Sequence, residues 1–192
     1  MTTVESRSKA DSAVMRTYGR ADLAFVRGEG SWLITEDGTR YLDCASGIAV
    51  NTLGHSYPAL VDALKAQADQ LWHTSNLYRI PGQERVAEKL AALTGLDQVY
   101  FCNSGAEANE GAVKIARRAA FERGETERTT ILCATGSFHG RTLGMLAATD
   151  KRANRTGFGP MPDGFDHVAF GNLNALRDAL GPHVAAVMIE PV

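Results

Sequence analysis

The sequence lacks a long apolar run, a block of like charge and a targeting segment. Its longest uninterrupted apolar stretch, residues 184–189, is far shorter than the ~18 residues that suggest a membrane-spanning helix. The 20 Lys and Arg residues nearly balance the 22 Asp and Glu residues, and no basic cluster stands out. The polar start, residues 1–13, has no apolar core of a signal peptide. These absences argue against a membrane or nucleic-acid partner and favour a cytoplasmic protein.

Cysteine is scarce, and two familiar nucleotide-binding motifs are missing. The three cysteines, Cys44, Cys102 and Cys133, show no paired spacing, which argues against a disulfide framework and against a metal site. Each lies in an apolar stretch, so all three are expected to be buried, reduced thiols. Neither G-x-G-x-x-G nor G-x-x-x-x-G-K-[ST] occurs, so dinucleotide and P-loop nucleotide binding lose their main support.

The first part of the chain predicts a small β element followed by helices. Residues 1–17 are expected to be a loosely docked start, followed by strands at Trp32–Thr35 and 39–44 that Asp37-Gly38 joins as a hairpin turn. Pro58 and Pro81 suit the first turns of two helices. The side chains expected to face inward from these helices are Leu60, Val61, Leu64, Ala68, Leu71, Val86, Leu90 and Leu93, and Gly95 is expected to end the second helix.

From Gln98 onward the pattern alternates between short apolar strands and helices. The predicted strands are 99–102, 130–134, 167–170 and 184–189; the predicted helices are 104–123, 143–148 and 173–180; residues 150–164 are a predicted loop. This alternation predicts an α/β fold with a mostly parallel sheet and crossover helices. The helix 104–123 is expected to bury Ala108, Ala112, Ile115, Ala116 and Ala119. The last strand is predicted to be buried on both faces, and since the chain ends directly after it, we expect an N-terminal fragment.

A candidate anion site lies where the first of these strands turns into a helix. Ser104 and Glu107 form a capping box, which marks the helix start. The first helical amides have no intrahelical partner, and Gly105 lets a bulky anion approach the backbone. The segment is either a phosphate cradle or a plain helix cap.

A second candidate follows the next strand, in the segment Gly-Ser-Phe-His-Gly-Arg-Thr at residues 136–142. It should lie at the same carboxyl edge of the sheet, where open α/β sheets bind ligands. Phe138 could lie over a planar cofactor, and Arg141 offers a planar fork for a carboxylate. Alternatively, the segment is a glycine-rich turn with an exposed arginine. His139 is either a ligand or base, or a packing histidine.

An acid completes the candidate set at the end of the last strand. Glu190 should face the same edge as the two loops, although strand ends often carry acids. Three such signals at successive strand ends describe a pocket for a phosphate, a flat ring and a carboxylate.

The chain resembles the class III, ornithine-type aminotransferases throughout its length. The resembling stretches are residues 28–33, 37–43, 54–58, 77–78, 101–110 (Phe-Cys-Asn-Ser-Gly-Ala-Glu-Ala-Asn-Glu), 137–142 (Ser-Phe-His-Gly-Arg-Thr) and 189–192 (Ile-Glu-Pro-Val). The resemblance implies fold type I of the pyridoxal-phosphate enzymes, pyridoxal 5′-phosphate as cofactor, and a homodimer with sites at the interface. Residues 1–53 are then expected to belong to a small domain, and residues 54–192 to begin the large cofactor-binding domain.

The resemblance also assigns roles to residues. The residues expected to bind the cofactor are Ser104, Gly105, Ala106, Phe138, His139 and Glu190, with the amides of Gly105 and Ala106 on the phosphate and Phe138 on the ring. The residues expected to contact substrate are Arg141, which takes the α-carboxylate, Asn76 and Tyr78. The family's Schiff-base lysine and its pyridine-pairing aspartate follow the Ile-Glu-Pro-Val segment. None of Lys9, Lys65, Lys89, Lys114 and Lys151 is therefore expected to serve as that lysine, and we assign no catalytic residue in this chain.

The implied reaction moves the δ-amino group of N-acetylornithine to 2-oxoglutarate, as in arginine biosynthesis. Ornithine, succinylornithine, succinyl-diaminopimelate and γ-aminobutyrate are alternative amino donors, and a semialdehyde aminomutase is a related alternative. A different possibility is a non-catalytic cofactor-binding or interaction module.

Overall fold

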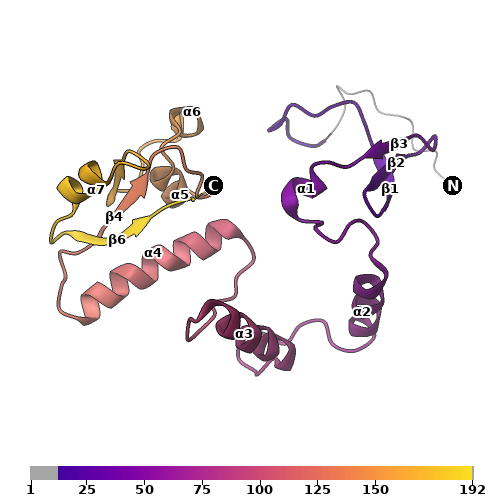
Figure 1. Cartoon of the computed structure of the whole chain (residues 1–192), viewed down its shortest axis with the longest axis horizontal. Coiled ribbons are helices and arrows are strands. Elements are labelled where there is room, and N and C mark those ends of the chain that lie inside the picture. Colours follow the sequence, from indigo (N-terminus) through magenta and orange to yellow (C-terminus); the bar gives the residue numbers. More distant parts are fainter. Residues whose placement is uncertain (1–12, 192) are drawn as a thin grey trace. The chain divides into compact units, whose positions relative to one another are not determined.

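The chain forms two compact units, which divide between Ile80 and Pro81 (Figure 1). The computed structural model describes residues 13–191; residues 1–12, which make up most of the predicted loose start, and Val192 lie outside them. The predicted domain boundary between residues 53 and 54 stays a prediction. None of the helices within the described range is both long and apolar enough to cross a membrane.

The first unit begins with an antiparallel sheet in the order β1 (Phe25–Glu29), β2 (Trp32–Thr35), β3 (Arg40–Leu42). The predicted hairpin between β2 and β3 is confirmed, and Gly38 takes the positive φ of 86° that its turn requires. Strand β1 was not predicted, since Arg27 and Gly28 interrupt its apolar pattern. The sheet is therefore one strand larger than the sequence indicated.

An ion pair ties a later loop to this sheet. His55 Nε2 lies 2.7 Å from Asp43 Oδ2, and the backbones of Gly30 and His55 form a β-bridge. The hydrogen bond from His55 is the main cause that lowers the pKa of Asp43. Gly28 makes room for the imidazole, because a Cβ there would lie 2.6 Å from His55 Cβ.

The two longer helices of the first 95 residues lie where they were predicted but are not buried, and a short helix before them was not predicted. After α1 (Ser46–Ala49), a short turn whose four residues have φ between 49° and 64°, come α2 (Pro58–Ala68) and α3 (Pro81–Thr94). Gly95 ends α3 with a φ of 72°, as predicted. The apolar faces of α2 and α3, predicted to point inward, contain no buried residue in this structure.

The second unit is built on a parallel sheet in the order β5-β4-β6. Besides α3, its elements are α4 (Gly105–Glu122), β4 (Thr130–Ala134), α5 (Leu143–Ala148), α6 (Arg152–Arg155), β5 (Phe165–Val168), α7 (Leu173–Ala179) and β6 (Val184–Met188). The predicted parallel sheet is confirmed. Two local predictions were wrong: residues 150–164 contain the short helix α6, and β5 begins two residues before the predicted strand, because Phe165 pairs with Ile131.

The core of this unit lies between the central strand and two helices. Ile131 and Cys133 of β4 pack against Val113 of α4 and against Met145 and Ala148 of α5. Figure 1 shows α4 running along this sheet. Burial raises the pKa of Cys133 to about 11, so this thiol stays protonated at neutral pH. The prediction of buried thiols fails for Cys44 and Cys102, which are exposed.

Three further sequence predictions were wrong in this unit. Residues 99–102 form no strand, because no described strand pairs with them. Strand β6 is only partly buried, since β4 is its one neighbour among the described strands. Helix α4 buries Gly111, Val113 and Ala120; of the predicted inner face, Ala116 packs against the core, but Ile115 is 60% exposed.

A pair of isoleucine substitutions, one in β4 and one in α4, tests whether the Ile115 side of α4 is unpacked. We expect Ile131→Ala to lower the free energy of unfolding by about 2–5 kcal/mol, because its side chain is fully buried. The matched change Ile115→Ala should cost less than about 0.5 kcal/mol, as at other exposed sites. Urea denaturation of the 192-residue chain measures both. Equal losses would mean that Ile115 is packed as tightly as Ile131 and that the exposed position of Ile115 is wrong.

Candidate functional site

The predicted helix cap at Ser104 forms at the start of α4, although Glu107 reaches back to Asn103 and not to Ser104 as in a standard capping box. The backbone amide of Glu107 donates to Ser104 Oγ at 3.2 Å, and the Glu107 carboxylate accepts from the amide of Asn103 at 2.5 Å. Beside Gly105 the space is open, since an added Cβ would meet no heavy atom within 4 Å. The amides of Gly105 and Ala106 come first in the helix and have no carbonyl one turn earlier. A helix end with free amides and open space fits the approach of an anion.

The loop of residues 136–142 is held at the carboxyl ends of β4 and β6. Ser137 Oγ donates to the carbonyl of Ala134 at 2.7 Å, and the amide of Phe138 donates to Glu190 Oε2 at 2.8 Å. These bonds bring Glu190 to the loop, at the edge of the sheet where the sequence placed it. The loop backbone is thus fixed from the two strands beneath it.

The same loop is fixed to α4. The side chain of Asn109 donates to the carbonyl of His139 at 2.8 Å, and the hydroxyl of Thr142 donates to Glu110 Oε1 at 2.5 Å. Sequence reasoning gave Asn109 and Glu110 no role. Their spacing of three and four residues from Ala106 was a signal, because such residues share a helix face.

A close backbone approach adds to these hydrogen bonds. Gly140 has a φ of 136°, and a Cβ at this position would lie 2.8 Å from Ala106 Cβ. Both the conformation and the available space therefore require glycine. The helix end and the loop are in direct contact, and together with Glu190 they form what we call the candidate site.

Two side chains of the loop, Phe138 and Arg141, are exposed. Phe138 is 47% exposed, and the Arg141 guanidinium carbon lies 5.8 Å from the centroid of its ring. A planar aromatic face next to a guanidinium suits a flat ring that carries, or lies beside, a carboxylate. The arrangement fits the phosphate, ring and carboxylate that the sequence indicated.

His139 lies on the closed side of the loop. Its side chain is 5% exposed, its amide donates to Thr149 Oγ1 at 3.0 Å, and its Nε2 has no protein partner. Burial lowers the pKa of His139, Glu190 opposes this shift, and His167 adds to it. The imidazole is accordingly held neutral, which suits a packed side chain more than an acid.

Asn76 and Tyr78 belong to the first unit. Both are exposed in a turn in which the amide of Tyr78 donates to the carbonyl of Ser75 at 3.3 Å. Their predicted contact with substrate stays a prediction.

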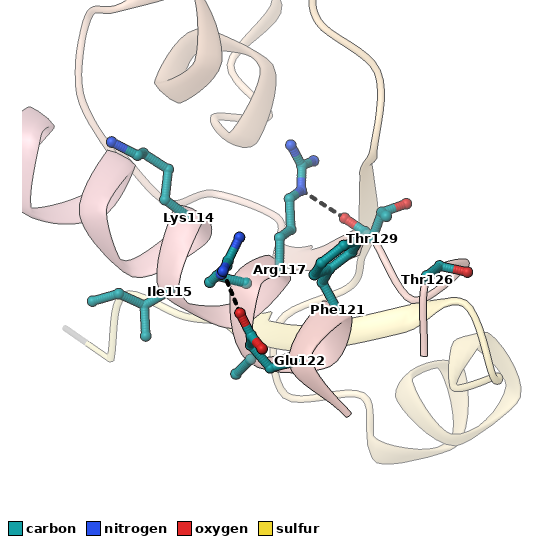
Figure 2. Close-up of a pocket in the computed structure, with 9 residues that line it drawn as sticks. Lys114, Ile115, Arg117, Phe121, Glu122, Thr126 and Thr129 are labelled. Carbon is teal, nitrogen blue, oxygen red and sulfur yellow. Dashed lines mark hydrogen bonds and ion pairs between the residues drawn. The ribbon is translucent and has the colours of Figure 1, made fainter. Parts of the chain in front are cut away.

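The second unit also has a cavity of about 830 Å³ on the later half of α4 (Figure 2). Ile115 and Phe121 give it apolar walls, and a hydrogen bond from Arg117 Nε to the carbonyl of Thr129 lies at its rim. None of the predicted site residues lines this cavity. It therefore gives the candidate site no support.

Curated relatives match almost the whole chain. It is 50% identical over 185 residues to the acetylornithine aminotransferase of Agrobacterium fabrum, covering 96% of this chain and 46% of that protein. It is 54% identical over 176 residues to the Brucella melitensis protein of the same name, covering 92% and 44%. The chain thus spans about half the length of these relatives.

Solved structures give the same picture. Ornithine aminotransferase from Toxoplasma gondii matches with a TM-score of 0.87 and 30% identity, covering 94% of this chain and 43% of that one. N-acetylornithine aminotransferase from Stenotrophomonas maltophilia matches with a TM-score of 0.73 and 35% identity, covering 91% and 43%. These neighbours confirm the predicted fold type I architecture. Since the family model for class-III aminotransferases also matches residues 13–192, the chain belongs to the class-III aminotransferase family.

Proposed function

We propose that this chain is the part of a pyridoxal-phosphate-dependent aminotransferase that holds the cofactor phosphate and the substrate carboxylate. The observation that carries the proposal is the candidate site itself: one unit places free helix amides, an exposed aromatic ring and an arginine together. The relatives named acetylornithine aminotransferase support N-acetylornithine as the amino donor and 2-oxoglutarate as the acceptor. We extend the proposal to a cytoplasmic homodimer.

Pyridoxal 5′-phosphate is the cofactor that this family assignment carries, and when bound it supplies an electron sink for the amino-acid carbon. The amides of Gly105 and Ala106, with Ser104 beside them, bind its phosphate, and Phe138 covers one face of its ring. Arg141 forms a bidentate pair with the substrate carboxylate. The chain's part in the reaction is therefore to bind and orient both molecules.

Glu190 and His139 act from beneath the loop. Glu190 accepts a hydrogen bond from the amide of Phe138, so its carboxylate fixes the backbone from which the aromatic ring projects. His139 stays neutral and fills the space under the loop. The proton carrier of the family is a lysine, and we assign that role to none of the lysines within residues 1–192. Asn76 and Tyr78 are proposed to contact substrate.

Ornithine is the second candidate donor, because the T. gondii ornithine aminotransferase is among the similar structures. Both donors carry the α-carboxylate that Arg141 is proposed to bind. They differ in the acyl group on the α-nitrogen, to which the proposal assigns no residue.

A donor panel on the full-length gene product tests the function. We expect amine transfer from N-acetylornithine to 2-oxoglutarate with a kcat/KM at least about tenfold above that for ornithine, succinylornithine or γ-aminobutyrate. Borohydride reduction followed by intact-mass analysis should show one pyridoxyl group per chain. No transfer from any donor, with no adduct, would contradict the proposal.

The role of Arg141 can be isolated with a lysine. Arg141→Lys keeps the charge but loses the fork, so we expect the KM for N-acetylornithine to rise about 10- to 100-fold. A donor amine without an α-carboxylate should be unaffected. The matched control is Arg152→Lys on the exposed helix α6. A KM that rises equally for both amines would remove Arg141 from carboxylate binding.

The neutral state of His139 has a consequence for stability. The folded pKa is below the ordinary value of 6.5, so the unfolded chain binds a proton that the folded chain does not. The free energy of unfolding should therefore fall as the pH drops below 6.5, by up to about 1.4 kcal/mol per pH unit. The urea midpoint of His139→Gln should fall less steeply with decreasing pH than that of the wild-type protein. His73→Gln, at an exposed histidine, is the control for the substitution. Identical slopes in all three proteins would show that His139 is not held neutral.

A further inference from the structure

Two neighbouring side chains of α4 reach the loop on either side of Arg141. Asn109 donates to the carbonyl of His139, two residues before the arginine. Glu110 accepts from the hydroxyl of Thr142, the residue directly after it. Arg141 thus lies in a short segment whose two ends are both tied to the same helix.

That helix is also the one whose first amides form the anion-binding end. Asn109 and Glu110 lie one turn after Gly105 and Ala106, so they share a rigid frame with those amides. The contact of Ala106 with Gly140 adds a third point of attachment between the two bonds. Three points fix both the position and the orientation of the loop relative to the helix end.

The Glu110 bond also reaches the next helix. The Thr142 hydroxyl accepts from the amide of Met145 at 3.1 Å as the cap of α5, while it donates to Glu110. Gly144 leaves room for this carboxylate, because a Cβ there would lie 2.7 Å from Glu110 Oε1. Glu110 therefore orients the cap that begins immediately after Arg141.

We propose that Asn109 and Glu110 are positioning residues that set the distance and angle between the carboxylate-binding Arg141 and the phosphate-binding end of α4. The proposal rests on the proposed function, which assigns those two binding roles. Neither side chain touches substrate in this proposal; each acts through the loop. Asn109 and Glu110 then maintain the spacing at which the cofactor phosphate and the substrate carboxylate are bound.

A purely structural role gives a different result from a positioning role. Hydrogen bonds that only stabilise the fold would, when lost, lower stability and reduce activity toward every amine alike. Positioning residues should selectively weaken binding of donors that use Arg141. Amines with and without an α-carboxylate therefore separate the two roles.

The variants are Asn109→Asp, which removes the donor at nearly constant shape, and Glu110→Met, which removes the acceptor. Glu110→Gln is the conservative rescue, because an amide oxygen still accepts from Thr142. Glu122→Gln, at the far end of the same helix, is the matched control. All are made in the full-length protein loaded with cofactor.

We expect Asn109→Asp and Glu110→Met to raise the KM for N-acetylornithine about tenfold, the loss typical of one hydrogen bond to or near a charged group. The kcat/KM for an amine without a carboxylate should stay within about twofold of wild type, as should all values for Glu110→Gln. Hydrogen exchange at the amides of residues 138–142 should be faster in the first two variants only.

The outcomes separate the two proposals. Equal losses for both kinds of amine, or unchanged exchange in the loop, would overturn the positioning role. If the wild-type protein transfers no amine at all, the proposed function fails, while the exchange measurement still decides whether Asn109 and Glu110 hold the loop.

Discussion

Burial of strand β4 on both faces is the constraint on which the second unit depends. Leu132 and Cys133 point to opposite sides of the sheet, and neither is accessible to solvent. A shift of this strand by one residue would exchange its two faces and break the register with β5 and β6. The point where the chain leaves the sheet at Ala134 is therefore fixed, and with it the start of the loop that carries Phe138 and Arg141.

The loop of residues 136–142 is held in place because other segments of the chain form hydrogen bonds with its backbone. The amides of Phe138 and His139 and the carbonyl of His139 all have partners that come from other segments. The groups proposed to meet a ligand are the exposed ring of Phe138, the exposed side chain of Arg141 and the first amides of α4. Because the loop backbone is already fixed by hydrogen bonds, it loses little conformational entropy when a ligand binds.

Local signals in the sequence predicted the elements that depend on neighbouring residues. The Asp37-Gly38 turn, the Ser104 cap and the bounds of β4 and α5 all agree with the structure. Two predictions that depended on a distant partner were wrong. Residues 99–102 have a strand-like composition, but a strand needs a second strand beside it. The face of the alanine-rich helix α4 was ambiguous, because small residues occur on both sides and packing decides between them.

The residues of the candidate site also fall into those that the sequence revealed and those that only the fold brings together. The groups proposed to meet a ligand were visible in the sequence, since a capping-box pattern, an aromatic residue and an arginine follow predicted strands. The groups that hold them were not, because Asn109 and His139 are 30 residues apart and only the fold brings them together. The same holds for the contact between Ala106 and Gly140, which needs the three-dimensional path of the loop.

The contact between Ala106 and Gly140 joins the two halves of the candidate site, which are the start of α4 and the loop of residues 136–142. The two backbones cannot come closer, because the methyl group of Ala106 already lies against the backbone of Gly140. A ligand that pushes the helix end and the loop toward each other is therefore resisted by this contact. Under the proposed function, the residues with the smallest side chains in the site set how closely the phosphate-binding helix end and the carboxylate-binding loop can approach.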